Sequence, residues 1–176
     1  MFILKPQEVI PCCVERSDAS DMLGFQFRRW AFYFENESLY PLEEALQRCR
    51  FWLDSNQTPL EVRAILMESG GCRMGVHNPQ LKARPAAEVF EEMRTSSDLV
   101  KTHRWRARTF AKSFVGSEAV SWLCQRLQIQ REEAVALGQQ LLQQGIFAHV
   151  LLEADFEDSQ YFYRFTSDGA PDKRIL

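Results

Sequence analysis

The chain has 176 residues, of which 45% are hydrophobic and 26% are charged, and its formal net charge is −3. This length fits one domain or two small ones, and the near-average composition excludes wholesale disorder and fibrous architectures. Because 21 Lys and Arg side chains are balanced by 24 Asp and Glu side chains, the protein has no global basic field, and a local basic patch must hold any anionic partner.

Signals for secretion and membrane insertion are missing from the sequence. The aromatic-rich run Trp30 to Phe34 is far shorter than the roughly 20 residues that cross a bilayer, and no cationic segment precedes the apolar Met1 to Leu4. The five cysteines form no C-x-x-C pair, which favours reduced thiols and argues against a zinc site. We therefore expect a cytoplasmic protein, at most peripheral at a membrane, with no cofactor and no metal.

Turn-forming residues around Asn78-Pro79 indicate a boundary there. They divide the chain into a small α/β unit over residues 1–82, a second domain over 83–169 and a tail over 170–176. In the first unit the patterns predict the order β-α-β-β, which matches no family known to us. The elements are an aromatic strand over 25–34 with a bulge or register change near Arg28-Arg29, an amphipathic helix over 41–54, and a hairpin of 62–67 with 72–77 that turns at Gly70-Gly71.

The second half has helical spacing and turn signals that predict three helices and two extended regions, an α+β arrangement of the winged-helix kind. The predicted elements are a helix that Pro85 opens, extended structure over 99–115, a helix after a Gly116-Ser117 turn with a hydroxyl cap, a helix over 131–144 that ends at Gly145, and a terminal hairpin of 146–152 with 160–165.

Three ordered blocks of this half carry a family pattern: TFAKSFVGSEAVSWL over 109–123, REEAVALG from Arg131 followed by GIFAHV from Gly145, and FEDS with YFYRF over 156–165. Together they resemble the DEP domain, a family known from dishevelled, pleckstrin and many signalling regulators, over about residues 84–167. The resemblance implies three helices, a β-arm and a C-terminal hairpin, and a non-enzymatic docking module. The departures are Gln130 in place of a hydroxyl cap, Ser113 in place of cysteine or alanine, and an arm that is more cationic at Arg106.

The arm between Asp98 and Glu118 contains basic residues and no acid. In DEP domains such an arm contacts membranes or other proteins, so the resemblance implies a partner surface here. Each basic group near an anionic leaflet contributes about 1 kcal/mol. The alternative is that the cations only solvate the arm and prevent its edge from pairing with other strands. The candidate partner-binding residues are Lys101, His103, Arg104, Trp105, Arg106, Arg108 and Lys112.

If the arm is a strand, the alternation of its side chains projects Arg104, Arg106 and Arg108 to one face and His103 and Trp105 to the other. We expect Trp105 to pack against the core of its own domain, with interfacial anchoring in a membrane as the alternative.

The function that these features predict is that of a docking, adaptor or regulatory protein whose arm binds a protein complex or an anionic phospholipid surface. The first unit serves in this interpretation as a partner-specific or scaffold module, and an arm-swapped homodimer stays open. Motifs of phosphate-binding loops, hydrolases and metalloproteases are missing, so we expect no enzymatic activity. The alternative is a nucleic-acid-binding regulator of winged-helix type, which the glutamine-rich but weakly basic helix over 131–144 disfavours.

Overall fold

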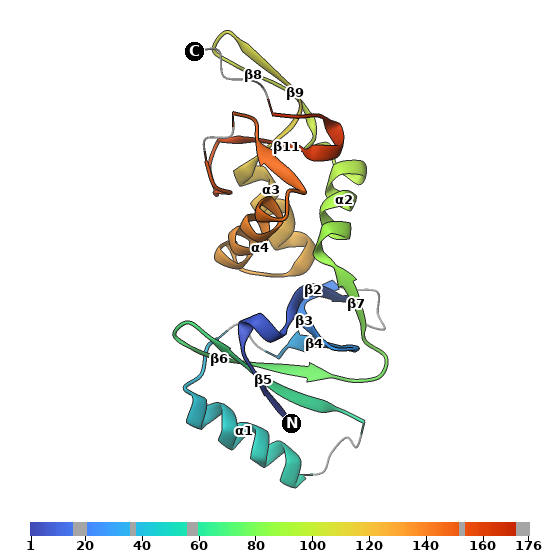
Figure 1. Ribbon diagram of the computed structural model, residues 1–176, viewed down its shortest axis with the longest axis vertical. Coiled ribbons are helices and arrows are strands. Elements are labelled where there is room, and N and C mark those ends of the chain that lie inside the picture. The colour runs from blue at the N-terminus through green and yellow to red at the C-terminus, as the bar shows by residue number, and fades with distance from the viewer. Residues whose placement is uncertain (16–20, 36–37, 56–59, 152–153, 172–176) are drawn as a thin grey trace. The chain divides into compact units, whose positions relative to one another are not determined.

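The computed structural model describes residues 1–15, 21–35, 38–55, 60–151 and 154–171. The chain forms two compact units, Met1–Pro85 and Ala86–Leu176, each with its own sheet (Figure 1). The mixture of helices and sheets confirms the predicted α+β class. The part of the predicted tail beyond residue 171, and the end of the strand predicted to reach residue 152, lie outside the described residues.

The first unit is a mixed seven-stranded sheet with the strand order β1-β5-β6-β4-β3-β2-β7. Strand β1 pairs parallel to β5, and the other neighbours are antiparallel. The elements are β1 (Phe2–Leu4), β2 (Ile10–Glu15), β3 (Asp21–Phe27), β4 (Trp30–Phe34), α1 (Leu42–Ser55), β5 (Val62–Glu68), β6 (Gly71–His77) and β7 (Lys82–Pro85).

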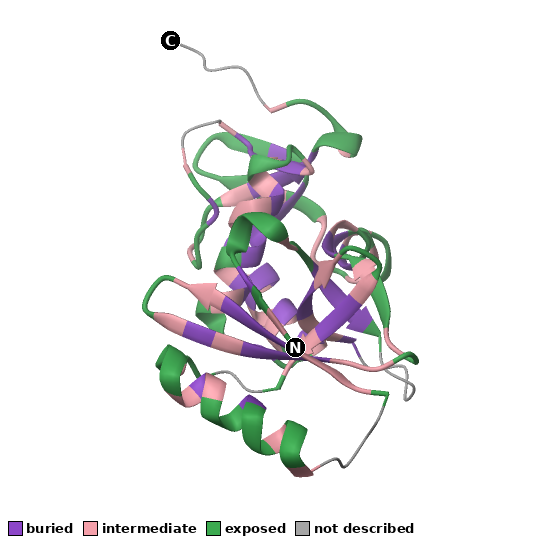
Figure 2. Ribbon diagram, turned by 60° about the horizontal axis from the view of Figure 1, so that its bottom comes forward, coloured by how far each residue is buried: buried purple, intermediate pink, exposed green. Residues whose placement is uncertain are grey.

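This sheet curls around an aromatic core. The ring of Phe2 on the edge strand β1 lies 5.3 Å from that of Phe27 and 5.1 Å from that of Trp30, although β3 and β4 are not neighbours of β1 in the strand order. Inside the curl the fully buried rings of Phe25 and Phe32 stack 5.0 Å apart. Helix α1 buries only Ala45 and Cys49 and exposes most of its surface, while buried residues gather along the strands (Figure 2).

The predicted order β-α-β-β is present in this unit as β4-α1-β5-β6, and the predicted helix and hairpin are confirmed within one or two residues. The single strand predicted over 25–34 is wrong. Phe27 pairs directly with Trp30, so Arg28 and Arg29 form a two-residue hairpin loop in which Arg28 has a φ of 56°. Such loops usually carry Gly, Asn or Asp, because these residues tolerate a positive φ. The arginines therefore gave no turn signal.

The second unit combines three helices with a four-stranded sheet of order β10-β11-β9-β8. These elements confirm the three helices, the extended arm and the antiparallel closing hairpin that the sequence predicts. They are α2 (Ala86–Ser96), β8 (Lys101–Trp105), β9 (Arg108–Val115), α3 (Gly116–Leu127), α4 (Arg131–Gln143), β10 (Phe147–His149) and β11 (Phe162–Phe165).

Backbone contacts hold the start of α3 and the end of α4. The predicted hydroxyl cap of α3 is wrong: the helix begins at Gly116, its cap residue is Val115, and the amide of Ser117 donates to the carbonyl of Ser159 instead. Helix α4 ends as predicted, because Gly145 has a φ of 73° and its amide donates to the carbonyl of Leu142.

All five cysteines are free thiols, as the sequence predicts. Four of them are buried, and burial raises the pKa of Cys12 to about 12. All four lie in the first unit, where they serve the packing as small apolar groups.

Candidate functional site

The predicted arm is a β-hairpin made of β8 and β9. Trp105 pairs with Arg108, so the loop consists of only Arg106 and Ala107. Arg106 has a φ of 54° and Ala107 does not have a positive φ, which is the φ pattern of a type II′ turn. The hairpin extends away from the helices of its own unit (Figure 1).

The base of the hairpin is anchored in the second unit by aromatic contacts. The ring of Phe110, which is 2% exposed, lies 5.3 Å from that of Phe162, and the ring of His103 lies 5.1 Å from the same ring. The buried Ser113 hydroxyl donates to the carbonyl of Phe110 at 2.9 Å and lies 3.1 Å from Nδ1 of His103. Since the hydroxyl has one proton, Nδ1 of His103 must be the donor in the second bond.

His103 is therefore a neutral part of the base of the hairpin. Its other ring nitrogen, Nε2, is buried and has no hydrogen-bond partner among the described residues. Burial, followed by the nearby charge of Lys101, lowers the pKa of His103. Of the seven candidate residues, this one supplies no positive charge at neutral pH.

We expect the stability of the second unit to depend on pH through His103. Its pKa is lowered in the folded chain, whereas the unfolded imidazole titrates near pH 6.5. Below that pH the unfolded chain binds the proton more readily, so the free energy of unfolding falls as the pH decreases from about 7 through 6.5. Urea unfolding at a series of pH values measures this slope. His103→Gln should make it shallower, and an unchanged slope would contradict the buried neutral imidazole.

A bulge in β9 fixes the direction of the hairpin. The pairing register shifts between Lys101 and His103, and Lys112 opposite them has a φ of 49°. Arg164, which is 8% exposed, donates from Nε to the carbonyl of Ala111 at 2.9 Å and from Nη1 to that of Ala170 at 2.8 Å. The sequence analysis did not identify Arg164 as a residue that positions the hairpin. An arginine inside the apolar strand YFYRF does indicate a buried charge that needs hydrogen-bond partners.

The structure corrects the predicted faces of the arm. Residues that pair directly across two antiparallel strands point to the same face of the ribbon. Trp105 and Arg108 are such a pair, and Arg104 belongs to the next pair along, with Thr109. Arg104 and Arg108 therefore project to opposite faces, with Arg106 in the loop between them. The cations surround the tip of the hairpin and do not line one face.

Trp105 also differs from the prediction. Its side chain is 50% exposed and does not pack into the core of the domain. The guanidinium carbon of Arg106 lies 4.3 Å from the centre of its ring, in a cation–π contact. The tip therefore presents an aromatic surface together with positive charge.

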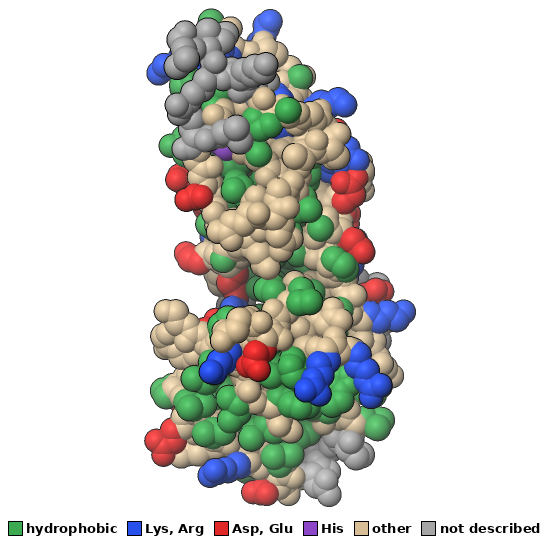
Figure 3. Space-filling model, in the orientation of Figure 1, with side chains coloured by type: hydrophobic (Ala, Val, Ile, Leu, Met, Phe, Trp, Pro, Cys, Tyr) green, Lys and Arg blue, Asp and Glu red, His purple; other side chains and the backbone are tan. Residues whose placement is uncertain are grey.

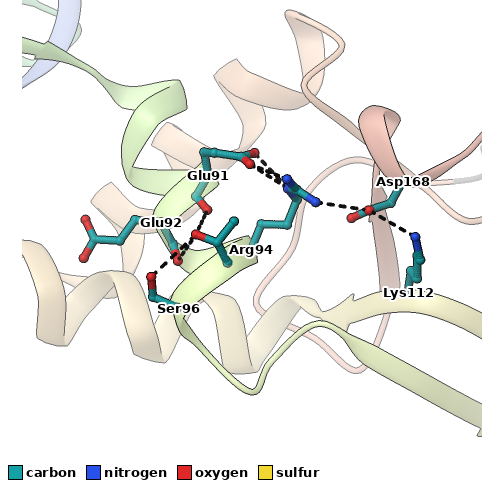
Figure 4. Close-up of polar contacts among 7 residues, drawn as sticks. Glu91, Glu92, Arg94, Ser96, Lys112 and Asp168 are labelled. Atoms are coloured by element: carbon teal, nitrogen blue, oxygen red, sulfur yellow. Dashed lines mark hydrogen bonds and ion pairs between the residues drawn. The ribbon is translucent and has the colours of Figure 1, made fainter.

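The two lysines at the base of the hairpin lie near carboxylates of their own unit. Nζ of Lys101 is 3.8 Å from Glu118 and Nζ of Lys112 is 3.7 Å from Asp168. Asp168 is shared with Arg94, whose Nη1 lies 3.2 Å away. Arg94 in turn contacts Glu91, so Lys112 joins a network of alternating charges (Figure 4). These lysines are partly neutralised and contribute less to an external partner.

The carboxylates of the described residues do not neutralise the three arginines of the tip in this way. Arg104, Arg106 and Arg108 are exposed and form no ion pair with any carboxylate of the described residues. An exposed guanidinium group without a partner is available for a charge-assisted contact with a carboxylate or phosphate. We refer to these three arginines and Trp105 as the hairpin tip.

Several basic residues elsewhere are engaged within the protein. On α4, Arg131 forms a bidentate pair with Asp158, with contacts of 2.6 and 2.7 Å that lower the pKa of Asp158. A cleft of about 550 Å³ beside α1 in the first unit contains Arg48 and Arg63, which pair with Glu44 and Glu35. In the view of Figure 3, hydrophobic side chains gather over the first unit and interrupt its basic residues. These positions do not concentrate uncompensated positive charge as the hairpin tip does.

Within the part of the chain that the structure describes, no helix has the length and apolar character needed to cross a lipid bilayer.

Comparison with known proteins places the site in a family. The family model described as "Domain found in Dishevelled, Egl-10, and Pleckstrin (DEP)" matches residues 99–165. The chain is 42% identical over 82 residues to the human phosphatidylinositol 3,4,5-trisphosphate-dependent Rac exchanger 2 protein, a match that covers 46% of this chain and 5% of the relative. It is 38% identical over 75 residues to the vacuolar membrane-associated protein IML1 of Saccharomyces cerevisiae, covering 42% of this chain and 5% of that protein.

A further match reaches into the first unit. The vacuolar membrane-associated protein IML1 of Scheffersomyces stipitis is 32% identical over 144 residues, which cover 77% of this chain and 10% of that protein. This share exceeds what the second unit alone can supply, since that unit begins at Ala86. The chain thus spans a tenth or less of the length of these three relatives. The matched segment, residues 99–165 with the β8–β9 hairpin at its start, belongs to the DEP domain family.

Proposed function

We propose that this chain is a non-catalytic docking module in which the hairpin tip binds an anionic partner surface. The observation that carries the proposal is the set of three exposed arginines without a carboxylate partner among the described residues. The half-exposed Trp105 adds an amphipathic ring at the same place, as is common at interfaces. A binding role of this kind needs no catalytic group, and we expect no turnover.

The comparisons support a regulatory role near membranes. Two of the relatives are named vacuolar membrane-associated proteins, and a third is named a phosphatidylinositol 3,4,5-trisphosphate-dependent Rac exchanger. For this chain we infer peripheral attachment through the hairpin tip, either to the anionic headgroups of a membrane or to acidic groups of a protein complex. The first unit, which exposes several large apolar side chains such as Phe51 and Leu60, would serve as the scaffold for further protein contacts.

The test is co-sedimentation of the full chain with mixed phosphatidylcholine and phosphatidylserine vesicles at low and high salt. Each basic residue near an anionic surface contributes about 1 kcal/mol, so Arg104→Glu with Arg108→Glu should lower the vesicle partition coefficient at least about 30-fold at low salt. The binding of the unaltered chain should also weaken as salt is raised.

Arg28→Glu with Arg29→Glu is the matched control. These residues form another two-residue hairpin loop with a positive φ, and the change in net charge is the same. This control should bind as the unaltered chain does, and circular dichroism should give the same folded spectrum for all three proteins. Equal loss in both double variants would mean that net charge, and not the hairpin tip, drives the attachment. Equal recovery of all three proteins with the vesicles would show that the lipid is not the partner of the hairpin tip.

A further inference from the structure

Within the described residues, strand β8 at one outer edge of the second sheet has a free side. β8 is the last strand in the order β10-β11-β9-β8, so only one of its two edges pairs with a neighbour. In a hairpin with a two-residue loop, the pair that closes the loop exchanges hydrogen bonds, and every second pair beyond it does so too. Trp105 and His103 therefore use their backbone groups toward β9. The amides and carbonyls of Thr102 and Arg104 point to the free edge.

This edge is exposed and carries positive charge. Thr102 and Arg104 are exposed, and their backbone groups make no other backbone hydrogen bond within the described residues. Lys101, Arg104 and the loop residue Arg106 lie along or beside it. Cationic side chains on an edge strand prevent pairing with an identical strand, because like charges would then meet. The same charges favour a strand of opposite charge.

The geometry points to a binding site for an acidic, extended polypeptide segment that adds a strand to the free edge of β8. This inference rests on the proposed function, because it states which chemistry the cationic hairpin selects. Two amides and two carbonyls of Thr102 and Arg104 would supply the backbone hydrogen bonds, as in other cases of strand addition to a sheet edge.

The two faces of the hairpin specify the side chains of the added strand. Directly opposite residues of neighbouring strands have Cβ atoms about 4.5–5.5 Å apart, close enough for an ion pair. On the face of Arg104, the added strand should therefore carry carboxylates. On the other face it should carry apolar side chains, because Trp105 exposes half of its surface there. The expected pattern is an alternation of acidic and apolar residues.

The probe is a short fluorescein-labelled peptide of alternating glutamate and valine, titrated with the full chain and followed by fluorescence anisotropy. A second peptide has the same sequence with its inner residues N-methylated, which keeps the charges and side chains but removes the backbone donors. We expect the first peptide to bind at least about tenfold more tightly than the second, because strand addition needs those donors. Equal affinity of the two peptides would overturn the inference.

Protein variants test the same contact from the other side. Thr102→Pro removes the outward amide of β8 and leaves the amides that face β9, whereas Thr102→Val keeps every amide. Thr102→Pro should weaken the binding of the unmethylated peptide about tenfold and leave the vesicle partition of the full chain unchanged. Thr102→Val should change neither the peptide affinity nor the vesicle partition. If Thr102→Pro disturbs the fold by circular dichroism, the two peptides with the unaltered chain decide the question.

The outcomes separate the inference from the proposed function. Retained vesicle binding with no preference for the unmethylated peptide overturns strand addition and leaves docking by the hairpin tip intact. Loss of both peptide and vesicle binding in the unaltered chain overturns both. A dimer in sedimentation velocity that Thr102→Pro dissociates would mean that a second copy occupies the edge, and it would overturn the acidic segment as occupant.

Discussion

Phe147→Ala is expected to lower the free energy of unfolding of the second unit by about 3–5 kcal/mol. The side chain is completely buried, and its ring lies between 5.4 and 6.1 Å from five other aromatic rings. Truncation leaves a cavity that rigid rings fill poorly, so the loss includes both the transfer of the phenyl group and the unfilled volume. The five neighbours are Phe90, Phe114, Phe156, Tyr163 and Phe165.

Urea unfolding of the full chain measures this effect, and hydrogen exchange assigns it to one unit. Phe147→Leu is the matched control, and because it keeps most of the volume it should cost about half as much or less. Amides of residues 1–85 should keep their protection in both variants. A loss below about 1 kcal/mol for Phe147→Ala would contradict the central position of this ring.

Gly24→Ala is expected to destabilise the first unit by about 3 kcal/mol and to disrupt the pairing of β3 with β4. A Cβ atom at this position would lie 2.0 Å from the carbonyl oxygen of Phe32 and 2.8 Å from Cγ2 of Val14. The first of these neighbours is backbone in the adjacent strand, so the clash cannot be relieved by a change of rotamer. The strand itself must move.

Amide exchange in β3 and β4, together with urea unfolding, checks this expectation. Gly70→Ala separates steric from conformational effects: Gly70 has a φ of 95°, but the nearest side-chain atom to an added Cβ lies 3.9 Å away. That control should cost about 1–2 kcal/mol and leave the amides of β3 and β4 protected. Equal stability of Gly24→Ala and the unaltered chain would mean that the two strands do not approach as closely as the structure indicates.

The elements that the sequence predicts well are those with strong local signals. α1 has apolar residues at helical spacing, and the β5–β6 hairpin has Gly70 at its turn. α4 ends at Gln143, shortly before Gly145, because glycine adopts the left-handed conformation without strain. The blocks that resemble the DEP domain are likewise contiguous in sequence, and the family model confirms them. Short edge strands such as β1 and β7 carry no such pattern, because pairing with distant strands is what makes them strands.

For the candidate site, too, local properties were predicted from the sequence and long-range contacts were not. Composition alone determined that the arm is basic and free of acids, because charge is a property of each residue. Its geometry depended on tertiary structure. A two-residue loop at Arg106 reverses the chain and places Arg104 and Arg108 on opposite faces. Because this loop contains no Gly or Asn, the sequence gives no turn signal for it. Which cations keep their charge available was also decided by packing, since Asp168 reaches Lys112 only through the fold. A strand's alternation is local, but its pairing and its counter-ions come from residues far away in the chain.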